Sequence, residues 1–168
     1  MESLVAVYKD LFLTRRWFIK GNLGAQGGRL SDQLERGGED FLPLREVLMT
    51  ELRDGTVVPS PTLLLNPDEV LIAHELIETG GDLYRKVTAS EAEQVYVKVV
   101  FEGVDGLTVR GKMRKDAFAP AHRGRRFLVL SQPRIEGLPD TLEEHGQLID
   151  SLSYLILNKR RVGHIFEF

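Results

Sequence analysis

The apolar positions of the chain occur in short runs separated by turn residues, a pattern typical of a mainly β protein. In the N-terminal part, this pattern favours strands at residues 5–8, 17–19, 41–44, 47–49, 62–65 and 70–73. The C-terminal part has similar runs at residues 96–101, 107–113, 127–130, 154–157 and 162–166. Turn signals, such as Asp54-Gly55 and Asn66-Pro67, separate the runs.

One segment has helical spacing. Leu30 and Leu34 are four residues apart, so they share one face of a helix. Asp32 suits the first turn, and Gly37 suits the residue after the last turn. The signals predict a helix over residues 30–36. Because two turns are not stable in isolation, we expect this helix to cap the open end of a sheet.

Three segments occur twice in the same order, which indicates an internal duplication. Residues 19–23, 41–44 and 62–66 resemble residues 109–113, 127–130 and 154–158, at offsets of 90, 86 and 92. We expect a first module at residues 1–77, a linker at 78–93 and a second, diverged module at 94–168. Each module is predicted to be a small, strongly bent β-sheet or barrel-like unit with at most one short helix. Because each is marginal in size, the two are expected to pack as a pseudo-symmetric pair.

Bulky apolar side chains stand next to one another in the first module. Phe12 lies between Leu11 and Leu13, and Trp17 precedes Phe18. Successive strand residues point to opposite faces, whereas a small barrel has one interior. We therefore expect a second buried surface. It lies either between the modules or in a partner or homodimer groove around Phe12, Trp17 and Phe18.

Charge adds a second candidate surface. The whole chain is nearly balanced, with 22 Lys and Arg against 25 Asp and Glu. Residues 1–84 hold 8 basic and 14 acidic side chains, whereas residues 85–168 hold 14 basic and 11 acidic ones. The candidate partner-binding cations of the second module are Arg110, Lys112, Arg114, Arg123, Arg125 and Arg126. They suit an acidic protein or a nucleic acid. The charged face of residues 107–113 lacks the aromatic side chains on which bases stack, which favours a protein partner.

The sequence offers little support for an enzyme. It has no cysteine, which excludes disulfides and thiolate metal sites. His74, His122, His145 and His164 are far apart and lack metal-ligand spacing, and no nucleophile motif is present. We predict no cofactor, no metal and no catalytic residue; an enzyme would require a cleft converging on His145 or His164. No apolar run approaches the roughly 18 residues of a membrane helix. The N-terminus does not have the pattern of a signal peptide, so a cytoplasmic location is expected.

Residues 28–34 (Gly-Arg-Leu-Ser-Asp-Gln-Leu), 41–44 (Phe-Leu-Pro-Leu) and 65–68 (Leu-Asn-Pro-Asp) together resemble a small bacterial family of unknown function. The resemblance covers roughly residues 5–77; the second module has a different sequence, at 115–120, in place of the helix motif. The family brings no established activity and no catalytic residues. Its occurrence in bacteria with elaborate signalling and surface motility implies an adaptor.

These observations together predict a non-catalytic adaptor or scaffold in bacterial intracellular signalling, cell polarity or motility. It would bind an acidic or strand-donating protein, because an incompletely closed barrel presents unpaired strand edges. The alternative is an RNA-binding small β-barrel that uses the basic face of the second module.

Overall fold

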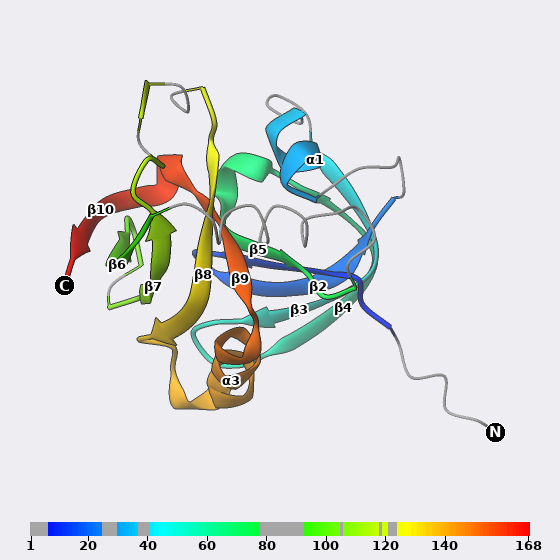
Figure 1. The fold of residues 1–168 in the computed structure, drawn as a ribbon. Coiled ribbons are helices and arrows are strands. Elements are labelled where there is room, and N and C mark those ends of the chain that lie inside the picture. The colour runs from blue at the N-terminus through cyan, green and yellow to red at the C-terminus, as the bar shows by residue number, and fades with distance from the viewer. Residues whose placement is uncertain are drawn as a thin grey trace.

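The computed structural model describes residues 7–24, 30–36, 41–77, 93–104, 106–117, 119–120 and 124–168. These residues form ten antiparallel strands in one sheet, in the order β10-β6-β7-β8-β9-β5-β1-β2-β3-β4. The first five strands are β1 (Asp10–Thr14), β2 (Trp17–Leu23), β3 (Leu42–Glu51), β4 (Val57–Leu65) and β5 (Val70–Glu75). The last five are β6 (Gln94–Phe101), β7 (Thr108–Arg114), β8 (Phe127–Glu136), β9 (Tyr154–Asn158) and β10 (Val162–Glu167). Figure 1 shows β6, β7 and β10 on one side of the molecule and β1 to β4 on the other.

The two halves of the chain have the same strand order. It is β5-β1-β2-β3-β4 in the first half and β10-β6-β7-β8-β9 in the second. The halves join where β5 pairs with β9, through Ile72 with Leu157 and Ala73 with Ile156. The mainly β class is therefore confirmed. The β5–β9 ladder makes the sheet continuous across both halves, and the sheet is not closed, so the expected barrel-like shape is not confirmed. The division into two modules at residues 1–77 and 94–168 stays a prediction. Most of the predicted linker, residues 78–92, lies outside the described residues.

Within the described ranges, two short α-helices accompany the sheet. The predicted helix is confirmed as α1 (Leu30–Arg36), and its Leu30 and Leu34 are buried. The second helix, α3 (Glu143–Ser151), follows the 3-10 turn η3 (Asp140–Leu142) and was not predicted. The sequence of α3 contains two apolar side chains, Leu148 and the buried Ile149, and because they are adjacent they show no helical periodicity. Two further 3-10 turns, η1 (Pro67–Glu69) and η4 (Lys159–Arg161), precede β5 and β10.

Two strand predictions of the first half are corrected. Of the strand expected at residues 5–8, residues 5 and 6 lie outside the described residues and residues 7 and 8 are not in a strand; β1 lies instead between this segment and the strand predicted at 17–19. Every residue of β1 is buried, so no polar alternation marks it as a strand. The two strands expected at 41–44 and 47–49 are one strand, β3. Glu46 adopts a positive φ of 51° there, which allows β3 to continue through an irregularity in its pairing with β2.

Both faces of the sheet are buried around β1. Leu11 and Leu13 belong to one apolar cluster, which also contains Val99 and Val109 of the second half. Phe12 belongs to a second cluster that contains Leu34 of α1. The consecutive bulky residues therefore do fill two cores, and both cores form within the chain. Of the two alternatives for the second buried surface, contact between the halves is the one observed.

Candidate interaction surfaces

One face of the β10-β6-β7 part of the sheet exposes aromatic and basic side chains together. Tyr96 is 53% exposed and Phe166 is 46% exposed. The register places Lys98 between Arg110 of β7 and Phe166 of β10. We call this surface the cation–aromatic face and define it by six residues: Tyr96, Lys98, Arg110, Lys112, Phe166 and Phe168.

The cations of this face lie close to its rings. Lys112 Nζ is 5.0 Å from the Tyr96 ring centroid, and Arg110 Cζ is 5.3 Å from that of Phe168. The Tyr96 and Phe168 centroids are 6.4 Å apart. Exposed cation–π contacts contribute about 0.5–1 kcal/mol each. The prediction that aromatic side chains are missing from this face is wrong, because neighbouring strands bring Tyr96 and Phe168 next to β7.

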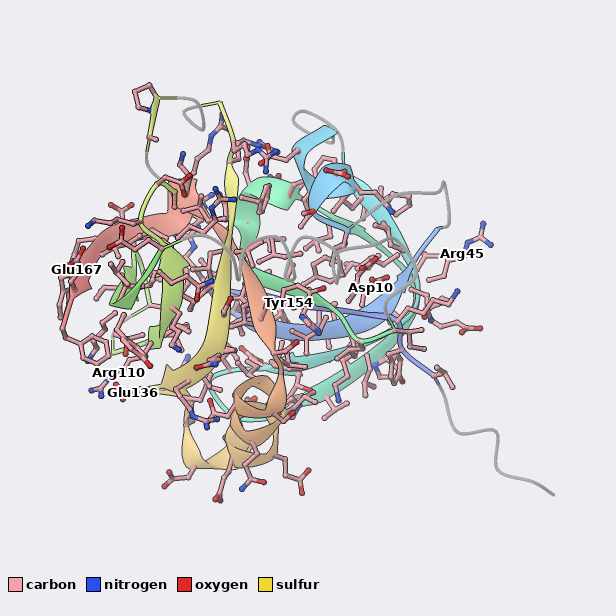
Figure 2. The ribbon with its side chains drawn as sticks, in the orientation of Figure 1. Asp10, Arg45, Arg110, Glu136, Tyr154 and Glu167 are labelled. Atoms are coloured by element: carbon pink, nitrogen blue, oxygen red, sulfur yellow. The ribbon has the colours of Figure 1, made fainter. Side chains whose placement is uncertain are left out.

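Glu136 of β8 partly neutralises the face. Its carboxylate lies 3.4 Å from Lys98 Nζ and 3.1 Å from Arg110 Nε. Figure 2 shows Arg110 and Glu136 side by side at the surface. Lys98 and Arg110 therefore share one carboxylate, whereas Lys112 is directed at the Tyr96 ring. The local charge remains positive although the whole chain has a net charge of -3.

Among the described residues, the two outermost strands, β4 and β10, each pair with one neighbouring strand, and we call them the free edges of the sheet. Most residues of both strands are exposed or half-buried, and Leu64 of β4 is 66% exposed. Every residue of β5 and of β9, by contrast, is buried. Pro59 and Pro61 remove two backbone N–H donors from β4, which is typical of an edge strand.

An apolar groove lies beside the β4 edge. It has a volume of about 480 Å³, and its lining includes Trp17, Met49, Leu63 and the exposed Phe41. Trp17 was predicted to bind a partner, and its half-buried side chain in this groove is accessible for that role.

Phe12 and Phe18, predicted together with Trp17, lie elsewhere. Both are buried in the apolar clusters, so neither forms a docking surface in the folded chain. Phe18 contacts the ring of His145 in α3, with centroids 4.4 Å apart. Phe12 and Phe18 are buried because the second half and the two helices cover both faces of the β1–β2 hairpin.

The predicted basic residues do not form one patch. Arg110 and Lys112 belong to the cation–aromatic face, and Arg125 is exposed. Arg114 forms an ion pair with Asp116 at 2.7 Å, and the hydrogen bonds to Asp116 raise the pKa of Arg114. Arg123 lies outside the described residues.

Arg126 connects the two halves instead of facing solvent. It is 8% exposed, and its guanidinium lies 2.8 Å from Asp68 Oδ1. It also donates a hydrogen bond to the backbone oxygen of Leu34 at 3.1 Å. Glu35 Oε1 accepts hydrogen bonds from the backbone N–H groups of Arg126 and Phe127, both at 2.8 Å. The prediction that Arg126 belongs to an accessible basic patch is therefore wrong.

The 3-10 turns add a second polar contact between the halves. Arg161 Nη2 of η4 lies 2.9 Å from Glu69 Oε1 of η1, and Arg160 Nη1 lies 3.4 Å from Asp68 Oδ1. Sequence reasoning missed these contacts. The available signal was that Asp68-Glu69 and Arg160-Arg161 stand at the same distance after Asn66 and Asn158, with opposite charge.

Four polar side chains are buried together on β1, β5 and β9. Asp10, His74, Glu75 and Tyr154 are each at most 6% exposed. Asp10 lies opposite Glu75 in the register of β1 and β5, and the rings of His74 and Tyr154 have centroids 4.6 Å apart. Figure 2 shows Asp10 and Tyr154 inside the molecule. Their burial keeps these groups from contacting a substrate in this conformation.

Burial raises the pKa of the Asp10 carboxyl. A hydrogen bond from the backbone N–H of Leu23, at 2.9 Å, and the nearby charge of Lys9 partly offset this effect. Asp10 therefore holds its proton more readily in the folded chain than in the unfolded chain.

The histidines proposed for an enzyme lie in different surroundings. His145 packs on Phe18, and burial, together with the charge of Lys20, lowers the pKa of His145, while Glu144 raises it in part. His164 of β10 stacks with Phe166, with centroids 6.3 Å apart. Among the described residues, no group of three or more histidines and carboxylates is placed to hold a metal ion.

No helix within the described ranges is both long enough and apolar enough to span a membrane. A scan against protein-family models and searches of the curated proteins and the solved structures found no match. The resemblance of residues 28–34, 41–44 and 65–68 to a small bacterial family therefore stays a prediction.

Proposed function

We propose that this chain is a non-catalytic protein-interaction module, an adaptor or scaffold that binds partners by β-strand addition at its free edges. The observation that carries this proposal is the contrast between the exposed strands β4 and β10 and the fully buried strands β5 and β9. An edge strand presents unpaired backbone N–H and C=O groups, with which an extended segment of another chain can pair.

The surroundings of each edge specify the chemistry of the partner. The groove with Trp17 and Phe41 lies beside β4 and suits an apolar anchor. Lys98 and Arg110 lie on the strands next to β10 and suit acidic side chains of an added strand. The partner proposed for β4 is a strand-donating segment with an apolar anchor, and the partner proposed for β10 is one with acidic side chains.

We also infer that the two halves are diverged copies of one five-stranded unit. The ladders within each half support this, because they have the same register at fixed offsets. Phe12 pairs with Ile19; Val99, 87 residues after Phe12, pairs with Val109, 90 residues after Ile19. The same correspondence holds between β3–β4 and β8–β9, with offsets of 86 and 92.

Irregular features recur at the same offsets. Glu46 and Gln132, 86 residues apart, have positive φ values of 51° and 52°, which are uncommon for non-glycine residues. Each lies where the pairing with the preceding strand is irregular. Asn66 and Asn158, 92 residues apart, each cap a 3-10 turn with the side-chain oxygen. Identical irregularities support a common origin more strongly than similar strands do, because strand order alone recurs in unrelated proteins.

On this proposal, the β5–β9 junction is already an example of strand addition between two modules. A role in bacterial signalling, cell polarity or motility, in the cytoplasm, rests on the family resemblance of residues 28–34 and remains part of the proposal.

The test is affinity capture from native lysate in the presence of nuclease, followed by quantitative mass spectrometry. Leu64→Lys on β4 and Phe166→Glu on β10 place a charge at each outermost strand, and the carboxylate on β10 repels an acidic partner. Val7→Lys is the matched control, because Val7 is also exposed but precedes β1. We expect the edge variants to lose a stoichiometric partner that the control retains. Equal recovery by all three variants would overturn the proposal.

A second candidate function is binding of single-stranded RNA at the cation–aromatic face. The specific observation in its favour is that Tyr96 and Phe168 are exposed beside Lys112 and Arg110. Exposed rings next to cations on a sheet face are how many small β folds stack unpaired bases and neutralise phosphates.

Fluorescence anisotropy with a labelled oligouridine tests this second function. Tyr96→Ala and Phe168→Ala should each weaken binding about 5-fold to 160-fold, because base stacking on a ring contributes about 1–3 kcal/mol. With about three phosphate contacts, the plot of log K against log salt should have a slope of about -2. Val57→Ala, an exposed control on β4, should bind normally. Ring variants that bind as tightly as the unchanged chain would exclude this function.

A further inference from the structure

The geometry points to a second copy of this chain as a strand donor: β4 of one chain pairs with β10 of the next, head to tail. The inference rests on the proposed use of the free edges and adds the identity of one partner. The β5–β9 junction inside the chain is the template for this contact between chains.

In the order of strands, β9 occupies the position in the second half that β4 occupies in the first, and β10 corresponds to β5. The internal junction therefore joins a fourth strand to a fifth strand. The two ends of the sheet leave one fourth strand, β4, and one fifth strand, β10. A junction of the same kind can form between two chains without using any edge that is already paired.

The correspondence also predicts the register of the new junction. Ala73 pairs with Ile156 inside the chain. Ile165 is 92 residues after Ala73, and Leu64 is 92 residues before Ile156. Ile165 of one chain is therefore predicted to pair with Leu64 of the other. In the same way, His164 is predicted to pair with Leu65.

Exposure agrees with this register. Ile156 is 1% exposed in the internal junction, whereas Leu64 at the corresponding position is 66% exposed. Ile165 is partly buried and packs against the apolar cluster of the second half. Pairing of the two edges would cover Leu64 against Ile165, as Ile156 is covered at Ala73 in the existing junction.

The prolines of β4 do not interfere with this pairing. Pro59 and Pro61 lie in the part of β4 that extends beyond the counterpart of β9, since residues 62–66 correspond to residues 154–158. The prolines disfavour pairing along residues 57–61 and leave the donors of residues 62–65 intact. The available length of edge is thus the length that the internal junction uses.

Charge complementarity is retained when the roles of the halves are exchanged. Asp68 corresponds to Arg160, and Glu69 corresponds to Arg161, at the offset of 92. Inside the chain, the carboxylates come from the first-half turn and the guanidinium groups from the second-half turn. In the junction between chains, an acidic turn lies next to a basic turn again, while each turn also keeps its ion pairs within its own chain.

The junction between chains buries less apolar surface than the internal one. Leu11, Phe18 and Ile72, which belong to the core shared by the halves, correspond to Lys98, Thr108 and His164. We therefore expect reversible association that depends on protein concentration. Because the two edges differ, the contact is heterologous, and repetition produces either a closed ring or a filament.

The test uses the absence of cysteine from the sequence. Leu64→Cys and Ile165→Cys are prepared as separate full-length chains, mixed and oxidised with oxidised glutathione. Cross-strand pairs have Cα separations of about 4.5–5.5 Å, which a disulfide can bridge. Val58→Cys replaces Leu64→Cys in the control mixture, because Val58 is an exposed apolar residue in the part of β4 beyond the predicted junction.

We expect the Leu64→Cys and Ile165→Cys mixture to yield a disulfide-linked heterodimer at least ten times as abundant as that of the control mixture. A yield equal to the control would overturn the inference, and so would a product dominated by Leu64→Cys pairs, which indicates symmetric pairing of two β4 edges. The doubly substituted chain should form a series of linked oligomers.

The proposed function can be judged separately. If the heterodimer is absent while capture of another protein still depends on Leu64, self-pairing is refuted and strand addition to a different partner stands. If the heterodimer is absent and capture is also unaffected by Leu64→Lys, both fail.

Discussion

The matching bulges of the two halves make a sharp prediction about Gly111 of β7 and Gly21 of β2. Both glycines face an irregularity in the next strand, β8 or β3. A Cβ on Gly111 would lie 2.7 Å from the backbone oxygen of Ser131 and 2.7 Å from Leu130 Cγ. A Cβ on Gly21 would lie 3.2 Å from Val47 Cγ2, a side-chain methyl group.

The magnitudes differ because the neighbours differ. In Gly111→Ala, the backbone of β8 must move, and overpacking of this kind costs about 1–3 kcal/mol. In Gly21→Ala, a methyl group has to yield by a few tenths of an ångström. The reduced flexibility of the unfolded chain offsets this by about 0.4–1 kcal/mol. We therefore expect Gly111→Ala to be about 2 kcal/mol less stable than Gly21→Ala, although both change a buried glycine in the same structural position.

Urea unfolding followed by circular dichroism measures the difference. With a slope of about 1–3 kcal/mol per M, a 2 kcal/mol difference shifts the midpoint by roughly 1 M. Gly124→Ala is the control, because its Cβ would meet no atom within 4 Å. Equal midpoints for Gly111→Ala and Gly21→Ala would refute the close approach of β7 and β8 on which the reasoning depends.

Three further predictions concern the charged groups. Arg126→Met should lower the free energy of unfolding by about 2 kcal/mol, because charged hydrogen bonds between the halves are lost. Arg125→Met, at the exposed neighbour, should change the free energy of unfolding by less than about 0.5 kcal/mol in the same urea titration. Because the pKa of Asp10 is raised in the folded state, the folded chain loses stability as pH rises from the ordinary pKa of 3.8 through the raised pKa. The stability of Asp10→Asn relative to the unchanged chain should therefore increase between pH 3 and pH 7, and a constant difference would contradict this. Because the pKa of His145 is lowered, the folded chain loses stability as pH falls below 6.5, so thermal melts of His145→Phe should show a smaller loss between pH 7 and pH 5 than those of the unchanged chain.

Several features were predictable because local sequence determines them. The helix at residues 30–36 follows from the spacing of Leu30 and Leu34 and from Gly37. Strand β7 follows from alternation, since one of its faces is buried and the other is exposed. The three repeated segments lie where the two halves have the same strand register, which supports the proposed duplication without testing a common origin.

Other features depend on contacts that the sequence does not display. Strand β1 has no alternation, because the second half covers the face that carries Leu11 and Leu13. For the same reason Phe12 and Phe18, which are indistinguishable from docking residues in the sequence, are core residues. The role of Arg126 depends on Asp68, which is 58 residues away, so no local pattern marks it.

The cation–aromatic face also depends on strand pairing that the sequence does not display. Tyr96 and Phe168 lie on β6 and beyond the end of β10, and only their pairing brings them beside Lys112 and Arg110 on β7. A strand considered alone shows which residues share its face. Which strands are adjacent, and therefore which rings meet which cations, is decided by the sheet as a whole.

Hydrogen exchange followed by mass spectrometry, comparing the chain bound to a captured partner with the chain alone, tests the use of the free edges most directly. The account predicts slower amide exchange in residues 62–65 of β4 or in residues 162–167 of β10, with little change in β7. Protection confined to β6 and β7, with both edges exchanging as in the unbound chain, would contradict it.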